Sequence, residues 1–343
     1  MNILPRVFLT LGVGLCGAVV AFQLAWPAPA LIGSALAVSA LALLGQPMQT
    51  APFLRKFAFT AIGCSLGSGF TPEFFSLAAL WPLSLVGLTL ILALIMFSSG
   101  WILTRLFGHS RSTALLASSP GGLSLAIALA ASGIGDARAV SILQSLRLLF
   151  IVLGLPPLLL LTGLEEGSSW RPSPFLLDHV QAGVLFLAAY LLGGLGEKKS
   201  IPAAHIFAGM LLSGSTHATG LLVGTFPRPL LNLGFVVTGS VIGSRFSGVT
   251  WRDLRAFLGA AVLTIVVAIA LSATAAWLLA RTLDIPFGQA WVAYAPGGVE
   301  AMAAMAFALG YDPAFVATHH LFRILLLTLT VPILLRLAHE KPP

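Results

Sequence analysis

The chain has 343 residues, of which 58% are hydrophobic and only 8% carry a charge, and its mean hydropathy is +0.99. This composition excludes a soluble globular domain and indicates a polytopic membrane protein, in which backbone hydrogen bonding within lipid demands mostly helices. The net charge of +7 is explained by basic cytoplasmic loops and gives no reason to expect a nucleic-acid partner. The two cysteines, Cys16 and Cys64, lie in apolar stretches and offer no disulfide framework.

Apolar segments follow one another along the whole chain and predict six membrane segments in each half. In the first half they lie at 5–24, 28–46, 52–70, 76–104, 111–134 and 138–162. In the second half they lie at 176–194, 201–217, 229–246, 254–280, 287–309 and 314–336. The fifth segment of each half carries Pro-Gly-Gly near its middle, at 120–122 and 296–298, which predicts a break in the helix there.

The two halves are copies of one another. When the sequence is shifted by 176 residues, the halves align without a gap from about Gly33 to Pro156. Rare residues coincide in this alignment, among them Trp101 with Trp277, Arg105 with Arg281, Asp136 with Asp312, and Arg147 with Arg323. The pattern indicates a tandem duplication, with a first repeat at 1–164, an external loop at 165–175 and a second repeat at 176–343. Segment 5–24 has a counterpart at 181–200, so we predict that it is a membrane helix and not a cleaved leader.

The distribution of basic residues distinguishes two topologies. If both broken segments are hairpins that enter and leave on one side, thirteen basic residues lie inside and three outside. If every segment crosses, the split is ten to six, so the positive-inside rule favours the hairpins. We therefore predict an all-α polytopic membrane protein of two inverted repeats. Each repeat would have five transmembrane helices and one re-entrant hairpin, with about 10–12 membrane segments in total and both termini cytoplasmic. A broken helix that crosses fully is the alternative.

The Pro-Gly-Gly tips are the predicted binding site. Hairpin arms of about 10 residues reach the middle of a ~30 Å hydrocarbon core, where irregular backbone survives only inside protein or beside a wet cavity. The returning arm would point the positive end of its helix at a ligand, which suits an anion. Paired breakers in related halves are typical of transporter sites, whereas a lone break would more simply be a kink. The predicted binding residues at the tips are Ser119, Pro120, Gly121, Gly122, Pro296, Gly297 and Gly298.

Arg147 and Arg323 complete the predicted substrate site. Each follows an aspartate by 11 residues, and these aspartates, Asp136 and Asp312, are predicted to cap the last helix of each half. A charge at the bilayer centre costs at least ~2.5–3.5 kcal/mol, so each arginine needs a partner. That partner is either the freed carbonyls of a tip, Glu300 or a bound anion, which leaves a substrate ligand and a structural clamp as alternatives.

Glu300 breaks the symmetry between the halves, because its counterpart in the first half is Ser124. A site for a coupling proton or cation would do the same, so the ion-coupling candidates are Glu300, Ser124 and Thr318. For each hydroxyl taken singly, a bond to a helix carbonyl is the simpler expectation. The second half carries the fuller polar set, and we expect Arg323 to be more sensitive to substrate than Arg147.

These motifs resemble a known family. The second half reads "APGG-E-M" followed by "A--LG-DP-FVA--H--R", and the first reads "SSPGG" followed by "G-D-R-V---Q-LR". Over nearly the whole chain this resembles the AbrB duplication family of bacterial membrane proteins, which is distinct from the soluble DNA-binding regulator of the same name. The paired hairpins are also similar in architecture to the sodium/glutamate and sodium/citrate symporters. The resemblance implies a multi-pass protein of the bacterial inner membrane, in a family whose names range from ammonia monooxygenase to regulator of gene expression.

The favoured function is secondary active transport of a small, anionic solute, with carboxylates as first candidates, by alternating access coupled to H⁺ or Na⁺. We expect no enzyme activity, no cofactor and no nucleic acid, with the bilayer and the solute as partners and a homodimer as a possibility. One alternative is a membrane-embedded sensor or regulator that acts through a partner protein. Another is an ammonia-oxidising enzyme, which would need copper or iron, and the dispersed histidines speak against such a site.

Overall fold

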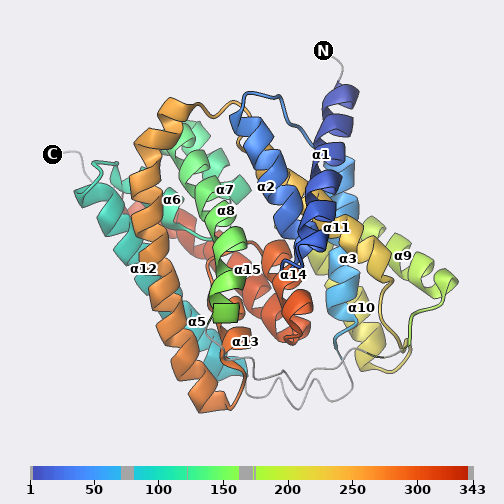
Figure 1. Ribbon diagram of the computed structural model, residues 1–343. Helices are drawn as coiled ribbons and strands as arrows, with labels where there is room; N and C mark the ends of the chain where they lie inside the picture. Colours follow the sequence, from blue (N-terminus) through green and yellow to red (C-terminus); the bar gives the residue numbers. More distant parts are fainter. Residues whose placement is uncertain (1–2, 71–80, 122, 162–172, 174, 339–343) are drawn as a thin grey trace.

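The protein is described here by a computed structural model that covers residues 3–70, 81–121, 123–161, 173 and 175–338 (Figure 1). These residues fold into helices, with one isolated β-bridge between Leu176 and Thr225. Six of the described helices are long and apolar enough to cross a membrane: α1 (Ile3–Gln23), α5 (Trp81–Arg105), α8 (Ala137–Leu161), α9 (His179–Lys198), α12 (Trp251–Leu283) and α15 (Pro313–Ala338). The prediction of an all-helical, multi-pass membrane protein is confirmed.

Three helices from each half form one bundle, which we call the framework bundle. The first half gives α1, α2 (Pro29–Leu43) and α3 (Pro52–Gly67), and the second gives α9, α10 (Ala204–Ala218) and α11 (Arg228–Ser244). The closest packing crosses between the halves, with α10 against α3 and α11 against α2. Four of these helices, α2, α3, α10 and α11, have only 15–17 residues, or about 22–26 Å of helix length.

Glycines of two Gly-x-x-x-Gly pairs, Gly63 with Gly67 and Gly239 with Gly243, allow this close packing. A Cβ added at Gly67 of α3 would lie 2.6 Å from the backbone nitrogen of Gly214 in α10. A Cβ added at Gly243 of α11 would lie 2.7 Å from the Cβ of Val38 in α2. Any larger side chain would therefore push the paired helices apart.

The remaining helices form a second bundle, which we call the tip bundle. It contains α5, α8, α12 and α15 and the short helices α6 (Arg111–Ser118), α7 (Leu123–Leu129), α13 (Phe287–Tyr294) and α14 (Val299–Leu309). The π-helical turn η1 (Ala130–Ile134) continues α7. Helices α6 and α13 begin 176 residues apart and also end 176 residues apart, so both Pro-Gly-Gly motifs interrupt their helices as predicted.

Each broken segment bends back on itself, so that its two ends lie together. The backbone N–H of Asp136 donates to Thr113 Oγ1 at 2.9 Å, and that of Asp312 donates to Gln289 Oε1 at 3.1 Å. The two bonds occupy the same place in the two halves and join the start of the segment to the start of the following helix. The same aspartates cap α8 and α15 through their side chains, with Asp136 Oδ1 accepting from Ala139 and Asp312 Oδ1 from Ala314, which confirms the predicted caps.

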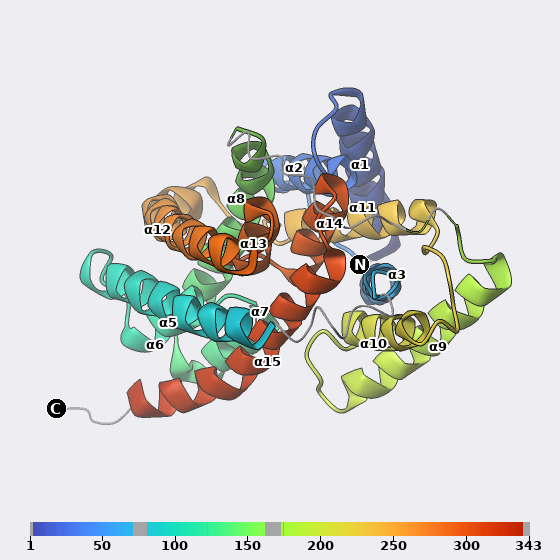
Figure 2. The ribbon, with the colours of Figure 1, turned by 90° about the horizontal axis from the view of Figure 1, so that it is seen from below.

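Helices α5 and α12, which are counterparts in the two halves, lie side by side and antiparallel (Figure 2). The ring of His109, just after the end of α5, stacks on Phe257 in the first turns of α12, with 5.9 Å between ring centroids. Arg138 at the start of α8 pairs with Asp253 at 2.6 Å beside the same end. The tip bundle is therefore closed at this end by aromatic and charged contacts.

Some predicted features lie outside the described residues. These are Gly122, the side chain of Ser124 and nearly all of the central loop 165–175.

Candidate functional site

The carbonyl groups of the second tip are held by Arg323. This side chain is only 1% exposed, and its Nη1 donates to the carbonyl of Ala295 at 2.8 Å. Its Nη2 donates to the carbonyl of Gly297. The break in the helix frees both carbonyls, so one planar guanidinium supplies donors that the helix no longer provides.

The first tip is held in the same way by Arg147. Its Nη1 donates to the carbonyls of Ala117 at 3.1 Å and Ser118 at 3.4 Å, and its Nη2 donates to that of Ser119 at 3.2 Å. Gln144, one turn earlier on α8, donates to the carbonyl of Leu116 at 2.6 Å. Helices α8 and α15 therefore each hold the irregular backbone of their own half.

The two tips meet near the centre of the protein. Gly121 has a φ of +102°, which favours glycine, and a Cβ added there would lie 3.2 Å from Arg323 Nε. Pro296 of the second tip and Arg147 line one small cavity of about 20 Å³. Each arginine thus binds its own tip and lies beside the other one, so the two broken segments form a single polar centre.

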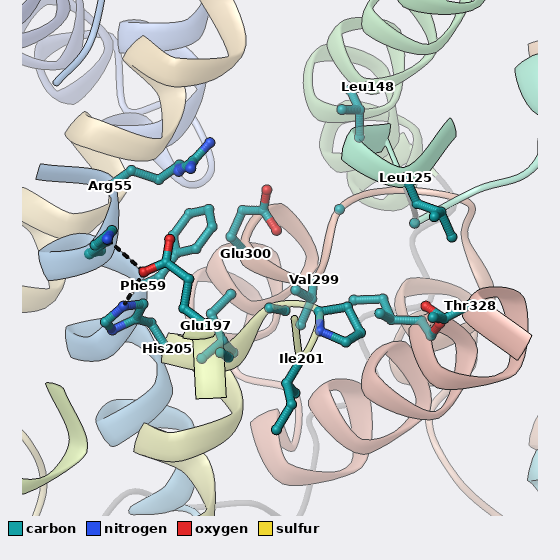
Figure 3. A pocket seen from close by; sticks show the side chains of 18 of the residues that line it. Arg55, Phe59, Leu125, Leu148, Glu197, Ile201, His205, Val299, Glu300 and Thr328 are labelled. Carbon is teal, nitrogen blue, oxygen red and sulfur yellow. Dashed lines mark hydrogen bonds and ion pairs between the residues drawn. The ribbon is translucent and has the colours of Figure 1, made fainter. Parts of the chain in front are cut away.

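A cavity of about 370 Å³ opens beside this centre, between the two bundles, and we call it the tip cavity. From the tip bundle it is lined by Gly121, Gly298, Glu300, Arg147 and Thr328. Figure 3 shows Arg55 and Glu300 extending from opposite walls toward the same space. A volume of this size is typical of small-ligand sites.

The opposite wall belongs to the framework bundle and is rich in charge. Lys56 pairs with Glu197 at 2.5 Å, and His205 Nε2 lies 3.8 Å from the same carboxylate. The Nδ1 of His205 is 3.1 Å from the hydroxyl of Thr60. Arg55 completes this wall.

Arg245, at the end of α11, also lines the tip cavity, and its Nη1 is buried without a hydrogen-bond partner. Helix α14 follows its N-cap residue Gly298 on the same cavity, and no side chain in the described part of the chain accepts a hydrogen bond from its first N–H groups. Glu300 lies in the first turn of α14, where its negative charge offsets the positive end of the helix.

The predicted site residues divide into three groups. Gly121, Gly298, Arg147 and Glu300 line the tip cavity. Ser119, Pro120, Pro296, Gly297 and Arg323 are buried behind it in the polar centre. Thr318 is half-buried in α15 away from the cavity, whose wall includes Thr328 instead. Of the two arginines it is Arg147 that reaches the cavity, although the polar set of the second half favoured Arg323.

The charged framework wall was missed from the sequence, where Arg55, Lys56 and Arg245 served only to orient the chain. A signal was present in the repeat itself. The counterparts of Arg55 and Lys56 are Leu231 and Asn232, and that of Arg245 is Gly69. These positions are charged in one half and uncharged in the other. The charges are therefore not required by the fold that the two halves share.

Within the described part of the chain, no group of three or more His, Cys, Asp or Glu side chains is placed to hold a metal ion. The histidines have other partners, since His319 contacts Ser84 at 2.8 Å and His320 contacts the carbonyl of Val292 at 2.9 Å.

The chain is similar to known proteins over most of its length. Residues 30–339 match the family described as "Transition state regulatory protein AbrB". The chain is 28% identical over 335 residues to a protein of Escherichia coli (strain K12) named "Putative regulator AbrB", with 92% of each chain covered. It is 27% identical over 277 residues to "Uncharacterized protein YhjN" of Bacillus subtilis (strain 168), with 74% of this chain and 71% of that one covered.

Proposed function

The chain belongs to the AbrB family, and we propose that it is a secondary transporter that carries a small anionic solute across the bacterial inner membrane by alternating access. The observation that carries this proposal is the tip cavity, which lies between two bundles and touches both broken helices at Gly121 and Gly298. Broken helices that meet at a cavity are the usual place where transporters bind their solute.

The architecture supports inverted repeats with two re-entrant hairpins. The ends of each broken segment are joined by hydrogen bonds from Asp136 and Asp312, as expected of a segment that returns to the side it entered. The counterparts α5 and α12 run antiparallel, as inversion requires. Both termini would then be cytoplasmic, as would the mouth of the tip cavity beside Arg55 and Lys56.

The charges of the cavity favour an anion. Its wall carries four basic side chains, Arg55, Lys56, Arg147 and Arg245, against two acidic ones, Glu197 and Glu300. Lys56 and Glu197 neutralise each other. The unpartnered Nη1 of Arg245 and the uncapped start of α14 both offer donors to a carboxylate.

Glu300 is the proposed coupling group, for H⁺ or Na⁺. Among the described residues no hydrogen bond or close ion pair engages its carboxylate, although its charge interacts with those of Arg245 and Arg323. The carboxylate faces the tip cavity, where a cation could reach it together with the solute. No catalytic step is needed for this role.

A thermal-shift measurement on purified protein tests the proposal. Succinate, citrate and glutamate, each with and without Na⁺, are the probes, and at least one is expected to raise the melting temperature. The variant Arg245→Gln should weaken that stabilisation by tenfold or more in ligand concentration. Arg252→Gln is the matched control, because Arg252 is exposed near the same face and away from the cavity. A panel that stabilises neither the wild type nor the control would refute an anionic solute.

The names of the relatives favour a second candidate, a membrane-embedded regulator. The same tip cavity would then bind a signal, and a partner protein would carry the output. Uptake of the stabilising anion into proteoliposomes separates the candidates, since a regulator binds the anion without accumulating it.

A further inference from the structure

A second cavity, of about 310 Å³, lies at the other end of α3 and has no part in the site described above. Arg55 of the tip cavity and Ser68 of the second cavity stand 13 residues apart, or about 20 Å along a helix. The wall of the second cavity includes Ala28, Pro29, Ala30, Leu231, Asn232 and Phe235.

The two cavities are counterparts under the internal repeat. Adding 176 to Ala28, Pro29 and Ala30 gives Ala204, His205 and Ile206, which line the tip cavity. Subtracting 176 from Leu231, Asn232 and Phe235 gives Arg55, Lys56 and Phe59, which line it too. The framework bundle therefore presents the same wall twice, once at each end.

Different parts of the tip bundle face the two walls. At the tip cavity the wall faces Gly121, Gly298 and Glu300, which belong to the tips. At the second cavity it faces Ala304, Phe307 and Ala308, which belong to the far part of α14. The ring centroid of Phe307 lies 6.5 Å from that of Phe235, so the far part of α14 forms the facing wall of the second cavity, as the tips do at the other end.

The same asymmetry appears in the packing of the short helices. Helix α14 packs against α3 and α11 of the framework bundle, whereas its counterpart α7, among the described elements, packs closely on α6, α8 and η1 of its own bundle (Figure 2). Ala304 is 1% exposed while its counterpart Ala128 is exposed, as is Ala131, the counterpart of Phe307. Helix α14 stays regular to Leu309, but α7 gives way to a π-turn with Gly133 at a φ of 92°.

We propose that the second cavity is the solute-binding cavity of a second state, in which the two halves exchange their arrangements. The tips then open onto Asn232 and Phe235, and the far part of α7 with η1 packs against the framework bundle. Ala131 comes to lie beside Phe59, and Phe307 leaves Phe235. This second state rests on the proposed transport function. It gives the solute a path across the protein, because the tips face one end of α3 in one state and the other end in the second.

The proposal also gives the second cavity a different set of side chains for the same solute. Leu231 and Asn232 stand where the tip cavity has Arg55 and Lys56, and Pro29 stands where it has His205. The second cavity has a basic side chain of its own, Arg228, whose counterpart in the first half is Pro52. At the tip cavity Lys56 is paired with Glu197, so the anion meets Arg55 on the framework wall in one state and Arg228 in the other.

Paired cysteines test the second state without any solute. In a background with Cys16→Ser and Cys64→Ala, the pair Phe235→Cys with Phe307→Cys reports the arrangement described here, and Phe59→Cys with Ala131→Cys reports the exchanged one. Mercuric ion is added to proteoliposomes, and bridged peptides are identified by mass spectrometry. The mixed pairs, Phe235 with Ala131 and Phe59 with Phe307, are matched controls that neither state brings together.

Both reporting pairs are expected to bridge, each at least tenfold more than the mixed pairs. Bridging of Phe235 with Phe307 alone, with Phe59 and Ala131 no better than the mixed pairs, overturns the second state. Equal bridging by all four pairs overturns it too, because it would mean unspecific contact. Bridging by both reporting pairs with no stabilising anion would refute the proposed solute and leave the second state standing. Anion uptake without the Phe59–Ala131 bridge would do the reverse.

Discussion

Replacing Arg323 by lysine is expected to destabilise the fold more than it weakens anion binding. The guanidinium donates to two tip carbonyls, of Ala295 and Gly297, from a site that is 1% exposed. A lysine has a single ammonium nitrogen, which cannot reach both carbonyls as the two terminal nitrogens of the planar guanidinium do. One buried carbonyl is then left without a donor.

The expected loss follows from one charged hydrogen bond, which contributes about 1.5–3 kcal/mol. The free energy of unfolding should therefore fall by about that amount in Arg323→Lys, as measured by denaturant titration of the protein in mixed micelles. Arg281→Lys is the control, because Arg281 lies in the last turn of α12, 5.5 Å from the Trp277 ring centroid, and binds no tip. Its effect should stay below about 0.5 kcal/mol, as for most surface substitutions.

The opposite pattern would refute this account. If Arg323→Lys kept the unfolding free energy of the wild type but lost stabilisation by the anion, the arginine would be a ligand and not a clamp. Arg147→Lys gives the internal comparison. Arg147 reaches the tip cavity and makes longer bonds of 3.1–3.4 Å, so its lysine variant should lose less stability and more anion affinity than that of Arg323.

Three further outcomes are expected. Gly121→Val should abolish folding or uptake, because φ is +102° and the added atoms would meet Arg323. Western blotting for the folded protein and an uptake assay measure both effects, and normal uptake would contradict close packing at this tip. Gln289→Leu should remove the hydrogen bond from the Asp312 N–H and lower the free energy of unfolding by about 1–3 kcal/mol. An unchanged free energy of unfolding would show that this bond does not hold the two ends of the broken segment together. A cysteine at Ser110 should react with an impermeant thiol reagent from inside and one at Phe287 from outside, and labelling of both from one side would exclude the inverted topology.

Local features of the site could be predicted from the sequence because they depend on backbone chemistry. Pro-Gly-Gly predicted the breaks, and the position of Asp136 and Asp312 at the start of the last helix of each half predicted both helix caps. The freed carbonyls were foreseen as one possible partner of Arg147, and this contact lies within one half of the chain. Such short-range arrangements follow from helix geometry alone.

The rest of the site depends on how the halves interlock, which local patterns do not encode. Arg55 and Glu300 face each other only because α3 packs beside the tip bundle. The π-turn at Ala130–Ile134 was missed, although Ser132 and Gly133 interrupt the apolar run there. The difference in packing between α7 and α14 could not be found from the apolar pattern, because that pattern predicts a buried segment in each half without showing which helices it packs on.

The order of the tip carbonyls and their arginines along the chain affects how the protein inserts during synthesis. In both halves the tip carbonyls precede the arginine that binds them, by 28–30 residues for Arg147 and by 26–28 for Arg323. Synthesis from the N-terminus therefore delivers the acceptors to the membrane before the charge that needs them. Each arginine, whose insertion alone costs about 2.5–3.5 kcal/mol, finds its partners already translated in the preceding segment. If the ribosome pauses before α8 or α15, the translocon holds the tip carbonyls of that half but not yet the arginine that binds them.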